Sequence, residues 1–263
     1  MKLYLAGSAS RKVADVIYAK GWPKLWSFLN EKRQIENAPP GADIMVDSGA
    51  HSWNKNSINR VGMASHRALP PLKEYAADYL KAVARLASTK FIFVELDVYG
   101  NLPMADINAM AEAAAKVIPK DRWMRVYHPI GDNGSMQMIR DWIKQGHTRI
   151  GLGKECRIML KRIFTTFPDI AFHGFAQTSI RHLEIYPYAT ADSTTWKAAS
   201  MFGGHFCPDR KRYFGKEDMV KMAPSIGRIK CHCDSVDIVN ATNMMRVQQH
   251  LTDLWKKRGY KWP

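Results

Sequence analysis

Two short stretches of the sequence place an aspartate at the end of an apolar run and follow it with small or hydroxyl residues. In "IMVDSGAHSW" Asp47 precedes Ser48 and Gly49, and in "YPYATADSTTW" Asp192 precedes three hydroxyl residues. Two carboxyl groups that face one pocket can exchange a glycosidic bond, because one attacks the anomeric carbon while the other transfers protons. We predict that Asp192 and Asp47 share one active site and that the neighbouring hydroxyls hold Asp192 charged and oriented.

Segments that favour strands alternate along the chain with segments of helical periodicity. The predicted strands cover 2–6, 44–48, 91–98, 123–128, 149–152, 170–175 and 189–192, with an eighth at 228–233. The predicted helices include 72–87, 105–118, 135–146, 157–167 and 240–259, the last capped by Asn240 and ended by Gly259. This alternation predicts an α/β fold, a (β/α)8 barrel that forms a single domain over 1–263 with a C-terminal helical extension. An open doubly wound sheet is the alternative, although no GxGxxG follows the first strand.

The carboxyl ends of the predicted strands carry polar residues or glycines in most cases. Barrels of this class place their active sites at these ends. An Asp or Ser just after a strand can also cap the next helix, so one such residue alone indicates little. Because polar residues or glycines recur at the ends of several strands, we predict an active site at these ends. The long polar segment 51–71 is predicted to be an active-site loop.

The charge balance predicts a polyanionic partner. Lys and Arg number 39 against 24 acidic residues, a formal net charge of +15. A basic surface that only aids solubility is the alternative. Two clusters interleaved with aromatic residues are candidate nucleic-acid contacts: Arg210, Lys211 and Arg212, and then Lys256, Lys257 and Arg258. The second cluster could equally be a solvated helix end.

The sequence predicts neither a membrane span nor a secretory signal. It contains no run of about 18 apolar residues that would predict a membrane span. Four cysteines in 263 residues do not predict a disulfide scaffold, so we expect a cytoplasmic protein, in the host cell if the chain is phage-encoded.

Several motifs in order resemble the tRNA-guanine transglycosylase superfamily. "VDSGAHSW" resembles its DSGG-type signature, and "FHGFAQTSIRHLEIYPYATADSTTW" resembles the HGFG…YP…VDSTSW pattern of the DNA 7-deazaguanine transglycosylases, the DpdA family. "ELDV", "YHP" and "IGLGK" follow the order of that family's pocket motifs, and the resemblance covers most of 1–200. His51 and Lys154 depart from the pattern.

The resemblance implies that guanine in DNA is replaced by a free 7-deazaguanine base of the preQ0 type. It makes Asp192 the nucleophile on C1′ and Asp47 the general acid/base, with no cofactor needed for the chemistry. Asp97 matches the acid that reads the base, and His128 stands where the tRNA enzymes have a glutamine. Further residues predicted to line the substrate pocket are Ser48, Gly49, Gly151, Leu152, Gly153 and Gly174. Double-stranded DNA is the expected partner polymer, and the base would have to leave the helical stack.

A cysteine pair late in the chain has two interpretations. Cys231 and Cys233 lie about as far past the nucleophile as the family's structural zinc motif, but Val236 stands where its third cysteine would be. Cys207 and His250 could complete four zinc ligands. Otherwise the cysteines are buried thiols that pack as small hydrophobic groups.

Two other functions remain open from the sequence. A tRNA-guanine transglycosylase would use the same chemistry on tRNA, although this chain is short for one. A non-catalytic nucleic-acid-binding barrel would not need both Asp47 and Asp192.

Overall fold

The computed structural model describes residues 1–51, 53, 70–98, 101–129, 132, 134–177, 179–201, 204–207, 212–214 and 234–262. At 198, 199, 201, 205–207 and 212–214 it describes the backbone only. Predictions that concern 52, 54–69 and 228–233, including most of the proposed active-site loop, therefore lie outside the described residues.

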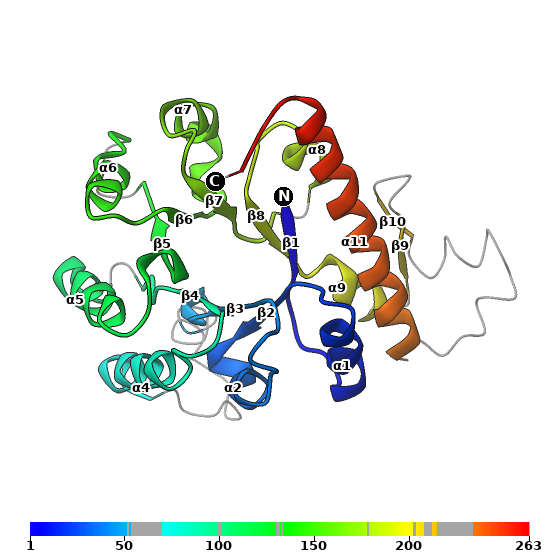
Figure 1. The fold of residues 1–263 in the computed structure, drawn as a ribbon, viewed down its shortest axis with the longest axis horizontal. Coiled ribbons are helices and arrows are strands. Elements are labelled where there is room, and N and C mark those ends of the chain that lie inside the picture. The colour runs from blue at the N-terminus through cyan, green and yellow to red at the C-terminus, as the bar shows by residue number, and fades with distance from the viewer. Residues whose placement is uncertain are drawn as a thin grey trace, which may run out of the picture.

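Eight parallel strands form a closed barrel in chain order, with helices around the outside (Figure 1). The strands are β1 Lys2–Leu5, β2 Lys24–Ser27, β3 Ile44–Asp47, β4 Ile92–Val94, β5 Trp123–Tyr127, β6 Arg149–Leu152, β7 Ala171–Gly174 and β8 Thr190–Ser193. β8 pairs with β1 over four residues and closes the sheet. The predicted (β/α)8 barrel is confirmed.

Helices follow the strands and form the outer layer. They are α1 Arg11–Ala19, α2 Phe28–Glu36, α4 Leu72–Arg85, α5 Met104–Ala115, α6 Gln137–Lys144, α7 Leu160–Thr166, α8 Ile180–Leu183, α9 Thr195–Met201 and α11 Asp234–Lys257. Two 3-10 turns, η1 Lys120–Arg122 and η2 Lys154–Met159, and an antiparallel hairpin, β9 His205–Cys207 with β10 Arg212–Phe214, complete the described elements. Among the described helices, none is long and apolar enough to cross a membrane.

One predicted barrel strand was assigned to the wrong segment. The barrel is completed by β2, which was not predicted, so 228–233 is not needed to close it. β2 has only four residues and begins with Lys24, a residue type that seldom starts a buried strand. Lys24 is nevertheless fully buried, because its Nζ donates to the carbonyls of Gly7 and Leu25, both at 2.7 Å, and lies 3.7 Å from the Trp26 ring centroid. Burial lowers the pKa of Lys24 to about 7.

The last helix, α11, covers the outside of the barrel beside β1 and α9 (Figure 1). It begins at Asp234 and not at Asn240, which is buried inside the helix, so the predicted cap was wrong. The predicted stop is confirmed, since Gly259 follows the helix with φ +77°. Asp234 at its start accepts a hydrogen bond from Ser10, just before α1, at 2.7 Å, and Thr252 near its end contacts the amino group of Met1 at 3.4 Å.

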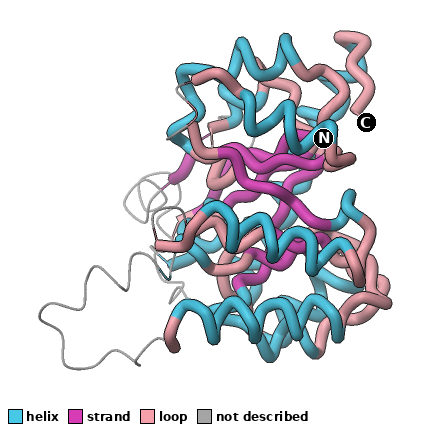
Figure 2. The backbone as a smooth tube through the Cα atoms, turned by 90° about the vertical axis from the view of Figure 1, so that its left-hand side faces the viewer, coloured by secondary structure: helices cyan, strands magenta, loops and turns pink. Residues whose placement is uncertain are grey.

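α11 therefore runs from the carboxyl end of the barrel strands toward their amino end. Its last residues lie beside the start of β1, and Figure 2 shows both chain termini at that same end. The C-terminal helical extension of the prediction is this helix.

The inside of the barrel changes character along its axis. Side chains alternate between inside and outside along a strand, so residues two apart share a face. Buried apolar side chains fill the interior: Tyr4, Ala6, Leu25, Met45, Val94, Met124 and Val126. Two residues beyond Met45 is Asp47, and two beyond Val126 is His128. The same alternation that builds the apolar layer therefore turns a polar layer inward at the carboxyl end.

Candidate active site at the barrel mouth

The structure brings the predicted acids together at the carboxyl end of the strands, which we call the barrel mouth. Asp47 is the last residue of β3, and Asp192 is the next-to-last residue of β8. Asp97 and His128 follow β4 and β5. The negative charges of Asp97 and Asp192 both raise the pKa of Asp47, as expected for carboxyl groups at the same end of the barrel.

Asp47 is a partly buried carboxyl group with no cation bound to it among the described residues. Burial, followed by the charges of Asp97 and Asp192, raises the pKa of Asp47 to about 7, although a hydrogen bond from the Gly49 N–H acts in the opposite direction. A carboxyl group with this pKa exchanges protons readily at neutral pH.

The turn after Asp47 depends on Gly49. Its φ is +81°, and a Cβ there would lie 2.6 Å from Cβ of Leu29 and 3.1 Å from the Tyr75 hydroxyl. That hydroxyl donates to the carbonyl of Ser48, which is fully buried. We expected Gly49 to let a ligand approach the backbone, but here it makes room for Leu29 and Tyr75 and directs its own N–H at Asp47.

Asp192 is held through one of its two oxygens. Oδ1 accepts a hydrogen bond from the backbone N–H of Ala176 at 2.8 Å and lies 3.3 Å from Nε2 of His173. The adjacent hydroxyl of Ser193 instead accepts from the N–H of Thr195 at 3.1 Å. The donors therefore come from β7 and the turn after it, where the sequence analysis had expected the hydroxyls that follow Asp192.

His128 bridges two carboxylates at the mouth. Its Nε2 lies 3.0 Å from Oδ2 of Asp97, and its Nδ1 lies 2.8 Å from Oε1 of Glu155. Burial lowers the pKa of His128, but the hydrogen bonds to Asp97 and Glu155 outweigh burial and raise it to about 9. The same hydrogen bond lowers the pKa of Glu155. At neutral pH His128 is thus an imidazolium that donates to both acids.

Glu155 was missed by the sequence analysis. It lies two residues past the "GLG" run, inside the short turn η2, and its carboxylate lies over Gly153. A Cβ at Gly153 would lie 2.3 Å from Oε1 of Glu155. The signal available in the sequence was an acid directly after a glycine-rich strand end, opposite a histidine at the end of the neighbouring strand.

The other predicted pocket glycines also accommodate side chains of this protein. A Cβ at Gly151 would lie 2.3 Å from the Phe175 ring, and one at Gly174 would lie 2.6 Å from Gln177. Leu152 is buried, and its carbonyl accepts from the N–H of Phe175 at 3.0 Å. The Phe175 ring therefore lies where the resemblance expects the base to meet the Gly151–Gly153 backbone.

The predicted basic clusters lie in different places. Arg210 and Lys211 are outside the described residues, and Arg212 is described only as backbone in β10. Lys256, Lys257 and Arg258 are exposed at the end of α11, at the opposite end of the barrel from the aspartates. Arg258 also donates to the carbonyl of Glu184 and lies over the Trp255 ring, both of which are structural contacts.

The predicted zinc ligands are mostly outside the described residues. Cys231 and Cys233 are not described, and Cys207 is described only as backbone. His250 is exposed, and its Nε2 lies 2.9 Å from Oε1 of Glu184. Within the described side chains no group of three potential metal ligands occurs, so the zinc site remains a prediction.

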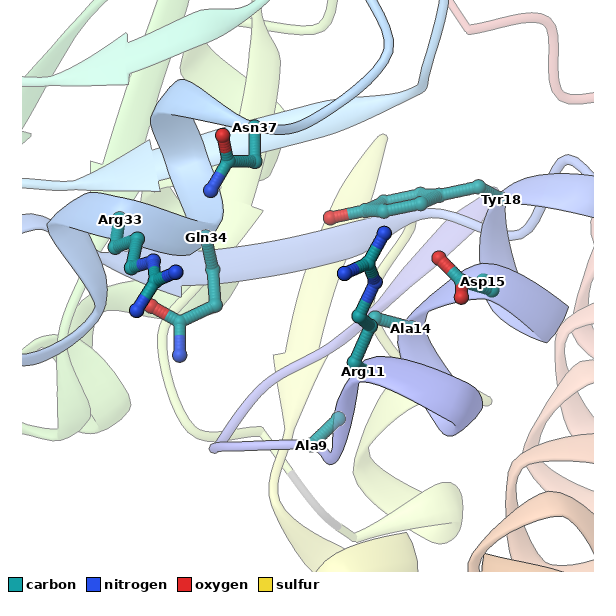
Figure 3. A pocket seen from close by; sticks show the side chains of 8 residues that line it. All are labelled: Ala9, Arg11, Ala14, Asp15, Tyr18, Arg33, Gln34 and Asn37. Carbon is teal, nitrogen blue, oxygen red and sulfur yellow. The ribbon is translucent and has the colours of Figure 1, made fainter.

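A separate hollow of about 630 Å³ lies on the outer wall between α1 and α2 (Figure 3). Its lining mixes basic, acidic and neutral side chains: Ala9, Arg11, Ala14, Asp15, Tyr18, Arg33, Gln34 and Asn37. Figure 3 shows Arg11 extending toward the Tyr18 ring. Neither predicted aspartate lines it, and it lacks the convergent carboxyl groups of the mouth, so we assign the candidate active site to the mouth.

Comparison of the sequence with models of protein families gives no match, and comparison with curated proteins finds no similar sequence. The geometry of the barrel mouth and the motifs described above are therefore the basis for assigning a function.

Proposed function

We propose that this protein is a base-exchange transglycosylase that replaces guanine in DNA with a free 7-deazaguanine base through a covalent sugar–enzyme intermediate. The observation that carries the proposal is the contrast between two neighbouring carboxyl groups. Asp47 has a pKa near 7, raised by burial and by neighbouring charge, whereas Asp192 accepts two hydrogen bonds on one oxygen. Acid–base and nucleophilic roles are commonly divided between carboxyl groups in this way.

In the first half of the reaction, Asp192 attacks C1′ of the target nucleotide. A bond forms between a carboxylate oxygen and C1′, and the C1′–N9 bond breaks with its electron pair passing to the departing guanine. Asp47 in its protonated form donates the proton that neutralises this guanine. A pKa near 7 means that a large share of Asp47 carries that proton at neutral pH.

In the second half, the free 7-deazaguanine takes the place of guanine. Its ring nitrogen donates an electron pair to C1′, the bond between C1′ and Asp192 breaks, and the pair returns to the carboxylate. Asp47, now ionised, accepts the proton from the incoming base. The two half-reactions leave both aspartates in their starting forms and need no cofactor.

Asp97 and His128 would recognise the base. Oδ2 of Asp97 is bound to His128, which leaves its other oxygen to accept from the amino and ring N–H groups of the pyrimidine edge. Because both ring nitrogens of His128 are engaged by carboxylates, we infer that His128 orients Asp97 and does not contact the base itself.

The net charge of +15 supports a polyanionic substrate, since neutralised phosphates supply most of the sequence-independent affinity for nucleic acid. Double-stranded DNA is the proposed polymer, on the likeness of the "YPYATADSTTW" segment to the DNA enzymes. A tRNA substrate would use the same mouth chemistry, and a non-catalytic binding subunit would use only the charge.

The test is nucleoside mass spectrometry of DNA and tRNA from cells supplied with a 7-deazaguanine base. Cells that express the protein should contain the 7-deazaguanine nucleoside in DNA, and cells that express Asp192→Asn should contain none, because an amide cannot form the sugar ester. Product in tRNA alone would transfer the proposal to tRNA. Product in neither polymer would refute the transglycosylase.

A further inference from the structure

Both hydrogen bonds that Asp192 accepts from described residues reach the same oxygen. Oδ1 is 2.8 Å from the Ala176 nitrogen and 3.3 Å from Nε2 of His173. An oxygen that already accepts two hydrogen bonds is a poorer nucleophile than its partner on the same carboxylate. Oδ2 is therefore the oxygen better suited to attack.

His173 is fixed in one orientation. It is fully buried in β7, and its Nδ1 lies 2.8 Å from Oγ1 of Thr190, a residue on the neighbouring strand. The rings of Tyr4 and Phe175 pack against it at centroid distances of 6.4 Å and 4.6 Å. A carboxylate oxygen can only accept, so Nε2 must carry a hydrogen, and the Thr190 hydroxyl can then donate to Nδ1.

Ala176 delivers its N–H from an unusual backbone conformation. Its φ is +51°, in the left-handed region that residues other than Gly, Asn and Asp rarely adopt. Such conformations persist where the surrounding structure enforces them, and they cluster at active sites. Here the conformation points a backbone donor at the carboxylate predicted to react.

We propose that His173 and the Ala176 N–H form a two-donor cradle for Oδ1 that selects Oδ2 as the attacking oxygen and stabilises the carboxylate when it leaves. This inference rests on the proposed function and adds a positioning role for His173 that the motif resemblance does not assign. In the covalent intermediate Oδ2 is bonded to C1′ and Oδ1 is the ester carbonyl oxygen. When the incoming base attacks, the C1′–Oδ2 bond breaks and its electron pair returns to the carboxylate. The negative charge is then shared by resonance between Oδ2 and Oδ1, and the two donors stabilise the share on Oδ1.

The effect should appear chiefly in the breakdown of the intermediate. A hydrogen bond to a charged group contributes enough to change a rate by about 10- to 100-fold. We therefore expect His173→Phe, which keeps a ring but removes the donor, to slow the release of the DNA adduct by about that factor. His173→Gln, whose amide can donate, should recover much of the loss, which a purely structural role for the ring would not predict.

The experiment traps the full-length protein on duplex DNA, adds a free 7-deazaguanine base and follows loss of the adduct on denaturing gels. His182→Phe makes the same chemical change in α8, outside the site, and should release the adduct at the wild-type rate. Equal release by wild type and His173→Phe, with both folded by circular dichroism, would overturn the inference.

A second measurement keeps the inference separate from the proposed function. Nitrogen-15 NMR of histidine-labelled protein should show His173 with hydrogen on Nε2, and its resonance should shift in Asp192→Asn. Hydrogen on Nδ1 alone would refute the cradle even if the enzyme is active. A wild type that forms no adduct with any nucleic acid would refute the proposed function, and the tautomer would still decide whether His173 donates to Asp192.

Discussion

Replacing Asp47 with asparagine should stabilise the folded protein at neutral and alkaline pH, because the carboxyl group is held where its charge is unfavourable. Burial and the charges of Asp97 and Asp192 raise the pKa of Asp47 from 3.8 to about 7. Between these values the folded chain holds a proton that the unfolded chain releases. The free energy of unfolding therefore falls as pH rises from about 4 to about 7, and it levels off above that.

The size of the effect follows from the two pKa values. The difference of about 3 pH units, at about 1.4 kcal/mol per unit, corresponds to about 4 kcal/mol. Asparagine has no charge to lose, so Asp47→Asn should exceed the wild type by up to about 4 kcal/mol at pH 8. Near pH 4, where the wild-type carboxyl group is also neutral, the two proteins should have similar stability.

Urea denaturation of both proteins at a series of pH values measures this difference. Other groups that titrate in the same range, such as Glu95, contribute to both curves and cancel in the subtraction. Asp78→Asn removes an exposed carboxylate paired with Lys32 at 2.7 Å and serves as the control, with an expected change below about 1 kcal/mol. Parallel stability curves for wild type and Asp47→Asn would show that Asp47 does not carry the raised pKa, and the acid–base assignment would lose its physical support.

Five further outcomes are expected. Asp47→Asn should slow base exchange by about 10²- to 10⁴-fold, and its enzyme–DNA adduct should accumulate and be visible on denaturing gels. Asp192→Asn should form no adduct, and the reverse pattern would exchange the roles of the two residues. Neutralising Arg210, Lys211 and Arg212 should flatten the salt dependence of DNA binding by about 0.9 in log–log slope for each phosphate that these side chains neutralise in the wild type. Neutralising Lys256 and Lys257 should leave that slope unchanged, because they lie at the other end of the barrel. Gly151→Ala should cost about 1–3 kcal/mol in urea denaturation, because a Cβ would lie 2.3 Å from the Phe175 ring. Metal analysis of the purified protein should find about one zinc per chain if the cysteine cluster binds it, and sub-stoichiometric zinc would remove that site.

The barrel could be predicted from the sequence because most of its strands are apolar runs between helical segments. This alternation is recognisable even when one strand is missed. The prediction missed β2 because the contacts that stabilise "KLWS" as a strand come from other parts of the chain. Lys24 is tolerated there only because the carbonyls of Gly7 and Leu25 and the face of Trp26 surround its ammonium group. Asn240 was mistaken for a cap because the residues that begin α11 lie before it, where Asp234 contacts Ser10 across 224 positions of sequence.

The candidate site was predictable to the extent that its residues stand at the carboxyl ends of strands. Asp47, His128 and Asp192 each stand at or next to the end of a predicted strand, so the strand ends indicated their place in a barrel. The hydrogen-bond partners of these residues could not be predicted from the strand ends. His173 and Ala176 reach Asp192 from another strand and turn, and Glu155 reaches His128 from the turn η2. The role of the predicted pocket glycines could not be predicted either, because the side chains that fill the space beside them come from other segments of the chain.

The three aspartates to which we assign different roles have different charged surroundings at the mouth. Asp97 is paired with an imidazolium, His128, whose pKa of about 9 keeps it positive at neutral pH. Asp192 receives an N–H and an imidazole on one oxygen. Among the described residues, the Gly49 N–H at Asp47 is set against burial and the negative charges of Asp97, Asp192 and Glu31, which together raise the pKa of Asp47 to about 7. Removing the positive charge of His128 should therefore leave the mouth with an excess of negative charge and raise the pKa of Asp47 further, so that Asp47 would remain protonated at pH values where the second half-reaction needs it ionised. In the proposed reaction, the imidazolium between Asp97 and Glu155 would therefore influence the pH range over which the two half-reactions alternate, although it would contact neither the sugar nor the nucleophile.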